Sequence, residues 1–173
     1  MTIENNISNS PFQDLLIVDI GGTVSTGFAG KLFVDYGARV VNLEPNEGFA
    51  TRKIKPYLQN GNSAMHGYLH ANKESVLVKD SLLKHPAILK ADLVLIDPST
   101  LSASISLDDF DVNVCFVSWF GLDGPYAEFF ADELIVYAMS GMAYASPGVP
   151  DVVTDQENEP PLHPNTNIAE SIA

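Results

Sequence analysis

Short apolar runs alternate along this chain with segments whose apolar residues recur at helical spacing. The apolar runs, rich in Val, Ile and Leu, predict buried strands at residues 15–20, 39–43, 75–78, 91–96 and 112–119. Helical spacing between them predicts helices at residues 26–36, 63–73 and 81–90, the last kinked or started by Pro86. This order is typical of α/β proteins, so we expect a Rossmann-like, mostly parallel sheet with helices on both faces.

The segment at residues 117–141 predicts a strand end, a tight turn and an amphipathic helix, in that order. The strand stops at Gly121, and Gly124 with Pro125 supplies the turn, because Gly tolerates positive φ and Pro presets φ. We expect the helix to begin near residues 131–133, where two acids lie over its positive N-terminal dipole. Open α/β sheets bind ligands beside turns at the carboxyl ends of strands, so this segment is a candidate ligand site.

Composition indicates one domain over residues 1–173, with a Pro-, Asp- and Asn-rich loop at residues 146–167. A chain of 173 residues with 46% hydrophobic content can bury one sizeable core. No apolar run reaches about 18 residues, and the first ten residues lack a basic or an apolar segment. We therefore expect a cytoplasmic protein without a membrane span. Cys115, the single cysteine, lies in an apolar run and is expected to be a buried packing thiol.

Charge is distributed unevenly along the chain. The net charge is −13, every Lys and Arg lies at or before Lys90, and fourteen acids follow that residue. Lys and Arg hold phosphate backbones, so the pattern argues against nucleic acids and anionic membranes as partners. A phosphate-bearing ligand would have to be held by the first half of the chain or by backbone amides.

Several motifs recur in the order found in one enzyme family. They are L-F-V-D-Y-G-A-R-V-V-N-L-E-P at residues 32–45, H-A-N-K-E-S-V at 70–76, A-D-L-V-L-I-D at 91–97, S-W-F-G-L-D-G-P-Y-A at 118–127, A-M-S-G at 138–141 and a Pro-Pro pair at 160–161. Together they cover most of the chain. The chain resembles the family III CoA-transferases, the CaiB/BaiF family that includes formyl-CoA transferase and carnitine CoA-transferase.

The resemblance implies an enzyme that moves coenzyme A from an acyl-CoA to a carboxylic acid through a carboxylate-bound acyl intermediate, without a metal. Glu170 occupies the position of the family's nucleophilic aspartate. The implied coenzyme A contacts are Val24, Arg39, Asn72, Lys73, Gly121, Gly124 and Tyr126. Family members are roughly twice as long, so the resemblance implies an N-terminal portion that acts as a homodimer or assembles with a missing C-terminal half.

Two roles stay open for Glu170. A carboxylate at a helix N-terminus is a suitable nucleophile, although Glu reaches farther than Asp by one methylene. Asn167 and Glu170 also have the spacing of a capping box, which needs no catalysis. Two positions where the family commonly has a base lack one here, at Glu74 and in residues 98–107. The alternative is therefore an inactive or truncated homologue that serves as a coenzyme A-binding or oligomerisation partner.

Two further patterns favour other chemistry. Residues 17–23, I-V-D-I-G-G-T, match the phosphate loop of actin-like and sugar-kinase proteins, which needs a β-hairpin directly afterwards. The residues that follow have helical spacing instead. His66 and His70 have the i, i+4 spacing of two metal ligands, but with no acidic or cysteine partner nearby a surface pair is expected.

Overall fold

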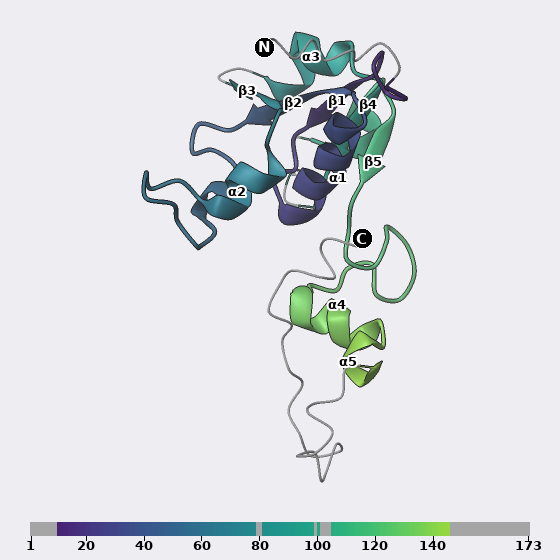
Figure 1. Ribbon diagram of the computed structural model, residues 1–173. Coiled ribbons are helices and arrows are strands. Elements are labelled where there is room, and N and C mark those ends of the chain that lie inside the picture. The colour runs from purple at the N-terminus through teal and green to yellow at the C-terminus, as the bar shows by residue number, and fades with distance from the viewer. Residues whose placement is uncertain (1–9, 79–80, 99, 101–104, 146–173) are drawn as a thin grey trace. The chain divides into compact units, whose positions relative to one another are not determined.

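The computed structural model describes residues 10–78, 81–98, 100 and 105–145. The chain divides into two compact units, Met1–Val117 and Ser118–Ala173, which are described separately (Figure 1). The expectation of one domain over the whole chain stays a prediction, and the loop expected at residues 146–167 lies outside the described residues.

A five-stranded parallel sheet forms the centre of the first unit, and it confirms the predicted α/β class. Its strands lie in the order β3-β2-β1-β4-β5. Their bounds are Leu16–Asp19 for β1, Arg39–Glu44 for β2, Glu74–Leu77 for β3, Leu93–Ile96 for β4 and Val114–Phe116 for β5. All five fall within about a residue of the predicted runs or inside them.

Local sequence explains where the helices of this unit begin. Helix α1 (Val24–Asp35) opens on a capping box between Thr23 and Thr26, and Ser63 caps α2 (Ala64–Leu69). The predicted helix at residues 81–90 is two short pieces, the 3-10 turn η2 (Leu82–Lys84) and α3 (Pro86–Leu89). Pro86 lacks an amide hydrogen and restricts the residue before it, so it starts a helix and cannot continue one. The 3-10 turn η1 (Ala50–Lys53) lies in the segment between β2 and α2.

Alternate side chains of the strands build two separate cores. On one face Ile17, Val40 and Leu95 pack against Ala29 and Phe33 of α1. On the other face, the buried residues are Val18, Ile20, Val41, Leu43, Ile88, Ala91, Val94 and Ile96, of which Ile88 belongs to α3. Helices thus cover both faces of the sheet, as its apolar strands require.

Cys115 is exposed, so the prediction of a buried packing thiol is wrong. Strand β5 is an edge strand, and its side chains alternate between the two faces. Val114 and Phe116 pack against the α3-side core, which leaves Cys115 on the opposite face. Helix α1 packs on β1, β2 and β4, so it leaves Cys115 uncovered.

The second unit contains the predicted turn and helix. Gly121 and Gly124 have φ values of 87° and 93°, the positive values that glycine permits. Asp132 caps α4 (Glu133–Met139) by accepting a hydrogen bond from the Ile135 amide at 3.0 Å. A second short helix, α5 (Met142–Ala145), follows Gly141. The helix expected near residues 131–133 is therefore confirmed.

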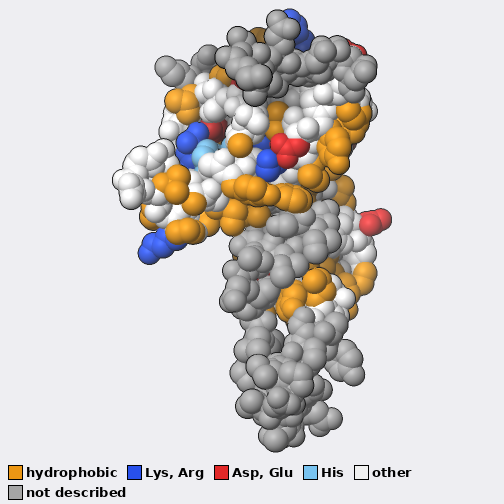
Figure 2. Space-filling model, in the orientation of Figure 1, with side chains coloured by type: hydrophobic (Ala, Val, Ile, Leu, Met, Phe, Trp, Pro, Cys, Tyr) orange, Lys and Arg blue, Asp and Glu red, His pale blue; other side chains and the backbone are white. Residues whose placement is uncertain are grey.

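Large apolar side chains lie on the surface of the first unit (Figure 2). They include Leu32 and Tyr36 of α1, Tyr68 of α2, and Val76 and Leu77 of the edge strand β3. No helix in the described part of the chain is long and apolar enough to cross a membrane.

Candidate functional site

The strand order creates a switch point between β1 and β4. After β1 the chain moves outward through β2 to β3, and it then returns to the other side of β1 for β4 and β5. Ligands of open α/β sheets bind at the carboxyl ends of the two strands at such a point. Here those ends lead into Gly21 and Gly22 after β1 and into Asp97 after β4.

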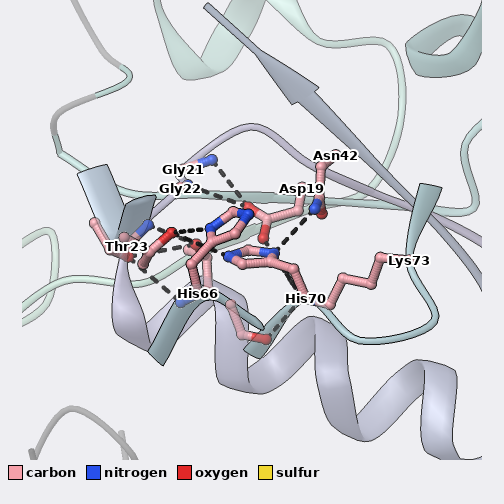
Figure 3. Close-up of polar contacts among 11 residues, drawn as sticks. Asp19, Gly21, Gly22, Thr23, Asn42, His66, His70 and Lys73 are labelled. Atoms are coloured by element: carbon pink, nitrogen blue, oxygen red, sulfur yellow. Dashed lines mark hydrogen bonds and ion pairs between the residues drawn. The ribbon is translucent and has the colours of Figure 1, made fainter. Parts of the chain in front are cut away.

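Asp19, the last residue of β1, is fully buried at this edge (Figure 3). Its Oδ1 accepts hydrogen bonds from the Gly21 amide at 3.1 Å and the Gly22 amide at 3.3 Å. Its Oδ2 lies 4.0 Å from the Nζ of Lys73, and both side chains are 0% exposed. Burial raises the pKa of Asp19, while the Lys73 charge and the two amides oppose that rise. The carboxylate therefore fixes the turn that joins β1 to α1.

Lys73 reaches this cluster from the loop between α2 and β3. Its Nζ donates to the carbonyl oxygen of Gly27 at 2.7 Å. Burial lowers the pKa of Lys73 to about 8, although Asp19 acts to raise it. Gly30 leaves the room for this side chain, because a Cβ there would lie 2.8 Å from the Nζ. Small residues on α1 thus permit a buried ion pair beneath the helix.

Two histidines from α2 and its C-terminus continue the polar network. His70 Nδ1 lies 2.9 Å from Asn42 Nδ2, and His70 Nε2 lies 3.2 Å from Thr51 Oγ1. Thr51 Oγ1 also lies 2.9 Å from His66 Nδ1, and the two imidazole rings are 4.4 Å apart. Burial, with the Lys73 charge, lowers the pKa of His70 to about 3.

His66 and His70 therefore do not form a surface pair, and that expectation is wrong for His70, which is buried. The i, i+4 spacing does place both rings on one helix face, and from it the His70 ring reaches Asn42 of β2. Among the described residues no group of three or more His, Cys, Asp or Glu side chains could hold a metal ion.

Glu44 fastens the loop after β2 to the sheet. Arg52 donates to both of its oxygens, from Nε at 2.6 Å and from Nη2 at 2.7 Å. The Phe49 amide and the Ser75 hydroxyl also donate to this carboxylate. Burial acts to raise the pKa of Glu44, but these hydrogen bonds outweigh it and lower the pKa to about 2.

A pocket of about 390 Å³ opens beside this loop, at the carboxyl edge of the sheet. It is lined by Ile20, Gly21, Leu43, Pro45, Glu47, Gly48, Phe49, Ala50, Val78, Leu82 and Thr100. Phe49 also contacts the His70 ring, with the ring centres 5.6 Å apart. The wall of the pocket is therefore connected directly to the buried polar network. Its size and largely apolar lining are typical of small-molecule sites.

The sequence profile of CoA-transferase family III matches residues 12–88, which span β1 to α3. The match covers the Asp19 turn, the Glu44 loop and the two histidines. The resemblance drawn from the sequence motifs is thereby confirmed.

Curated CoA-transferases align with most of the chain. It is 28% identical to acetyl-CoA:oxalate CoA-transferase of Acetobacter aceti over 82% of its length. It is 27% identical to succinyl-CoA–D-citramalate CoA-transferase of Chloroflexus aurantiacus over 94% of its length. The chain spans 39% of the first relative and 42% of the second.

Solved structures share the fold. A CaiB/BaiF family protein from Brucella suis matches with a TM-score of 0.68 at 20% identity, covering 94% of this chain and 45% of that one. A hypothetical protein from Mycobacterium tuberculosis matches with a TM-score of 0.64 at 24% identity, covering 83% of this chain and 43% of that one.

The expected coenzyme A contacts are spread over both units of the chain. Val24 is the buried first residue of α1, and Asn72 has a left-handed backbone with φ 63° next to the buried Lys73. Arg39 lies at the amino end of β2, paired with Glu74 at 2.7 Å.

The other expected coenzyme A contacts lie outside the first unit. Gly121, Gly124 and Tyr126 belong to the second unit, where the Tyr126 ring contacts Phe120 and Phe129. Glu170 lies outside the described residues. The ligand roles of all eight residues stay predictions.

The structure does not support the kinase interpretation of residues 17–23. The chain enters α1 directly after Thr23, where an actin-like or sugar-kinase fold requires a hairpin strand. Gly21 and Gly22 form a strand-to-helix turn, held by Asp19.

Several residues of the site were not singled out from the sequence. Asn42 and Glu44 lie within the motif at residues 32–45 but were given no role of their own, and Thr51 lies in a loop with no recognised motif. The available signal was polarity inside an apolar strand, since Asn42 and Glu44 interrupt a run of Val and Leu.

Gly22→Ala is expected to lower the free energy of unfolding by about 2–4 kcal/mol. Gly22 has φ +68°, and a Cβ there would lie 2.3 Å from the ring of the buried Phe49. Gly61→Ala is the matched control, because Gly61 has φ +82° with nothing within 4 Å. Urea denaturation of both variants measures the difference. Equal losses in the two would show that the contact with Phe49 does not constrain this turn.

Proposed function

We propose that this chain binds coenzyme A as part of a family III CoA-transferase and moves it between carboxylic acids. The observation that carries the proposal is its similarity, over most of its length, to enzymes named as CoA-transferases for oxalate, D-citramalate and glutarate. The pocket at the carboxyl edge of the sheet supports it, because that edge is where this class of sheet takes ligands. A cytoplasmic location and a homodimer, or an assembly with further polypeptide, are part of the same proposal.

In this proposal the pocket takes an apolar or aromatic part of coenzyme A, and Phe49 forms part of its wall. The phosphates need bases, and two arginines are already engaged. Arg52, in the loop beside the pocket, is held by Glu44, and Arg39, at the amino end of β2, is paired with Glu74. Lys53 and Lys55, exposed beside the pocket-lining segment, are the cations that we assign to the phosphates.

Glu170 is the proposed nucleophile. Its carboxylate oxygen attacks the thioester carbonyl carbon, the carbon–sulfur bond breaks, and coenzyme A leaves as the thiolate. The thiolate then attacks the Glu170 carbonyl of the mixed anhydride, which releases the acyl group as a carboxylate and leaves coenzyme A as a glutamyl thioester. The acceptor acid reacts with this thioester in the same two steps, in reverse order.

Calorimetric titration with coenzyme A, with Mg-ATP as a control, tests binding, and intact mass spectrometry after acetyl-CoA tests the adduct. We expect heat of binding with coenzyme A and none with Mg-ATP. We expect a covalent adduct in the parent chain and in Glu170→Asp, and none in Glu170→Ala. Glu159→Ala, another acid of the same segment, is the matched control and should keep the adduct.

Each other outcome has a distinct meaning. An adduct that is no greater in Glu170→Asp than in Glu170→Ala removes the catalytic role of Glu170. Coenzyme A binding with no adduct in any variant supports the alternative, a homologue that binds the cofactor or a partner without catalysis. Heat with Mg-ATP and not with coenzyme A would contradict the proposal.

A further inference from the structure

The network around His70 has a defined donor direction. Asn42 Nδ2 lies 2.9 Å from His70 Nδ1, and Lys73 Nζ lies 3.5 Å from the same nitrogen. Amide and ammonium nitrogens only donate hydrogen bonds, so with Asn42 Nδ2 and Lys73 Nζ facing it His70 Nδ1 is assigned as the acceptor and carries no proton. The proton of the neutral ring is then on Nε2, which faces Thr51 Oγ1 at 3.2 Å.

Thr51 joins His70 to His66 and fixes the direction of the next hydrogen bond. Its hydroxyl has one proton, and it accepts from His70 Nε2–H. That proton is therefore free to be donated to His66 Nδ1, at 2.9 Å. His66 Nδ1 accepts, and the proton of the His66 ring is on Nε2.

The relay, the chain of hydrogen bonds from Asn42 through His70 and Thr51 to His66, ends at the Nε2–H of His66. No described residue forms a hydrogen bond with His66 Nε2, and the side chain is only half-buried. His66 Nε2 is not among the buried side-chain atoms without a hydrogen-bond partner in the described part of the chain. This atom is therefore accessible to solvent. Burial and the Arg52 charge lower the pKa of His66, which keeps the ring neutral near pH 7.

We propose that His66 is a ligand-contacting residue that donates its Nε2–H to an acyl oxygen, either a thioester carbonyl or a free carboxylate. Asn42 and His70 (Figure 3), together with Thr51, are positioning residues that fix this tautomer. Phe49 in the pocket wall contacts the His70 ring, with the ring centres 5.6 Å apart, so the hydrogen-bonded network adjoins the pocket. The ligand part of this inference rests on the proposed function.

The tautomer is tested first, without ligand, by ¹H–¹⁵N NMR of the two histidine rings in the full chain. His66 and His70 should both show the Nε2–H pattern. Thr51→Val, close in volume but unable to donate, should shift His66 toward a mixture with Nδ1–H, whereas Thr51→Ser should retain the parent pattern. An Nδ1–H form of His66 in the parent chain, or no change in Thr51→Val, would overturn the relay.

The ligand role is tested by following the His66 ring signals during titration with acetyl-CoA, oxalate or coenzyme A alone, with calorimetry on the same samples. Acetyl-CoA, oxalate or both should shift the His66 ring signals. A shift with acetyl-CoA shows that the acyl oxygen belongs to a thioester, and a shift with oxalate shows that it belongs to a free carboxylate. Loss of one hydrogen bond in His66→Ala should weaken that ligand by about tenfold.

Three results would overturn the ligand role. Heat of binding with unmoved His66 signals would remove it and leave the proposed function intact. An equal shift with coenzyme A alone would assign His66 to a part of the ligand other than the acyl group. Binding of none of the three would remove both this role and the proposed function.

Discussion

Lys73→Met should lower the free energy of unfolding by about 3–5 kcal/mol. Lys73 and Asp19 are both 0% exposed, with Nζ and Oδ2 4.0 Å apart. Removal of the ammonium leaves the Asp19 carboxylate buried without a counter-charge, and it leaves the Gly27 carbonyl without its 2.7 Å donor. Urea denaturation followed by circular dichroism measures the loss.

Two controls separate the buried pair from a surface effect. Lys31→Met breaks an i, i+4 pair with the exposed Asp35 and should cost less than about 1 kcal/mol. The double variant Asp19→Asn/Lys73→Met removes both charges and should recover a large part of the loss. A Lys73→Met chain as stable as Lys31→Met would show that the pair does not stabilise the fold.

Replacement of His70 by Gln should make the protein less sensitive to acid. The pKa of His70 falls from an ordinary value of 6.5 to about 3 in the folded chain, so the unfolded state binds more protons between these values. Stability from the neutral ring is complete above pH 6.5 and is lost as the pH falls toward 3. At about pH 4.5 the loss should be on the order of 2–3 kcal/mol relative to neutral pH.

The comparison needs unfolding free energies for both chains across the same pH range. Glu44, with a pKa lowered to about 2, contributes stability that is lost only below its ordinary value of 4.5, and it does so in both chains. The difference between the two curves above that pH therefore reports mainly His70. Parallel curves would contradict the assignment of a buried, neutral imidazole.

The sequence predicts the strand at residues 15–20, and its end marks one edge of the candidate site. The pocket lies where this strand gives way to Gly21. The partners of the polar residues could not be predicted. Asp19 meets Lys73, and Asn42 meets His70, only after α2 packs beside α1.

The sequence by itself determined the order of strands and helices, the α/β class and the family, because side-chain periodicity and motifs are local properties of the chain. The tertiary structure decided which side chains lose contact with water. Cys115 is exposed because its strand is at the sheet edge, and His70 is buried because Gly27 of α1 leaves space for its ring. Sheet order and helix packing join residues distant in the chain, so burial, pKa and proton position at this site follow from the folded arrangement.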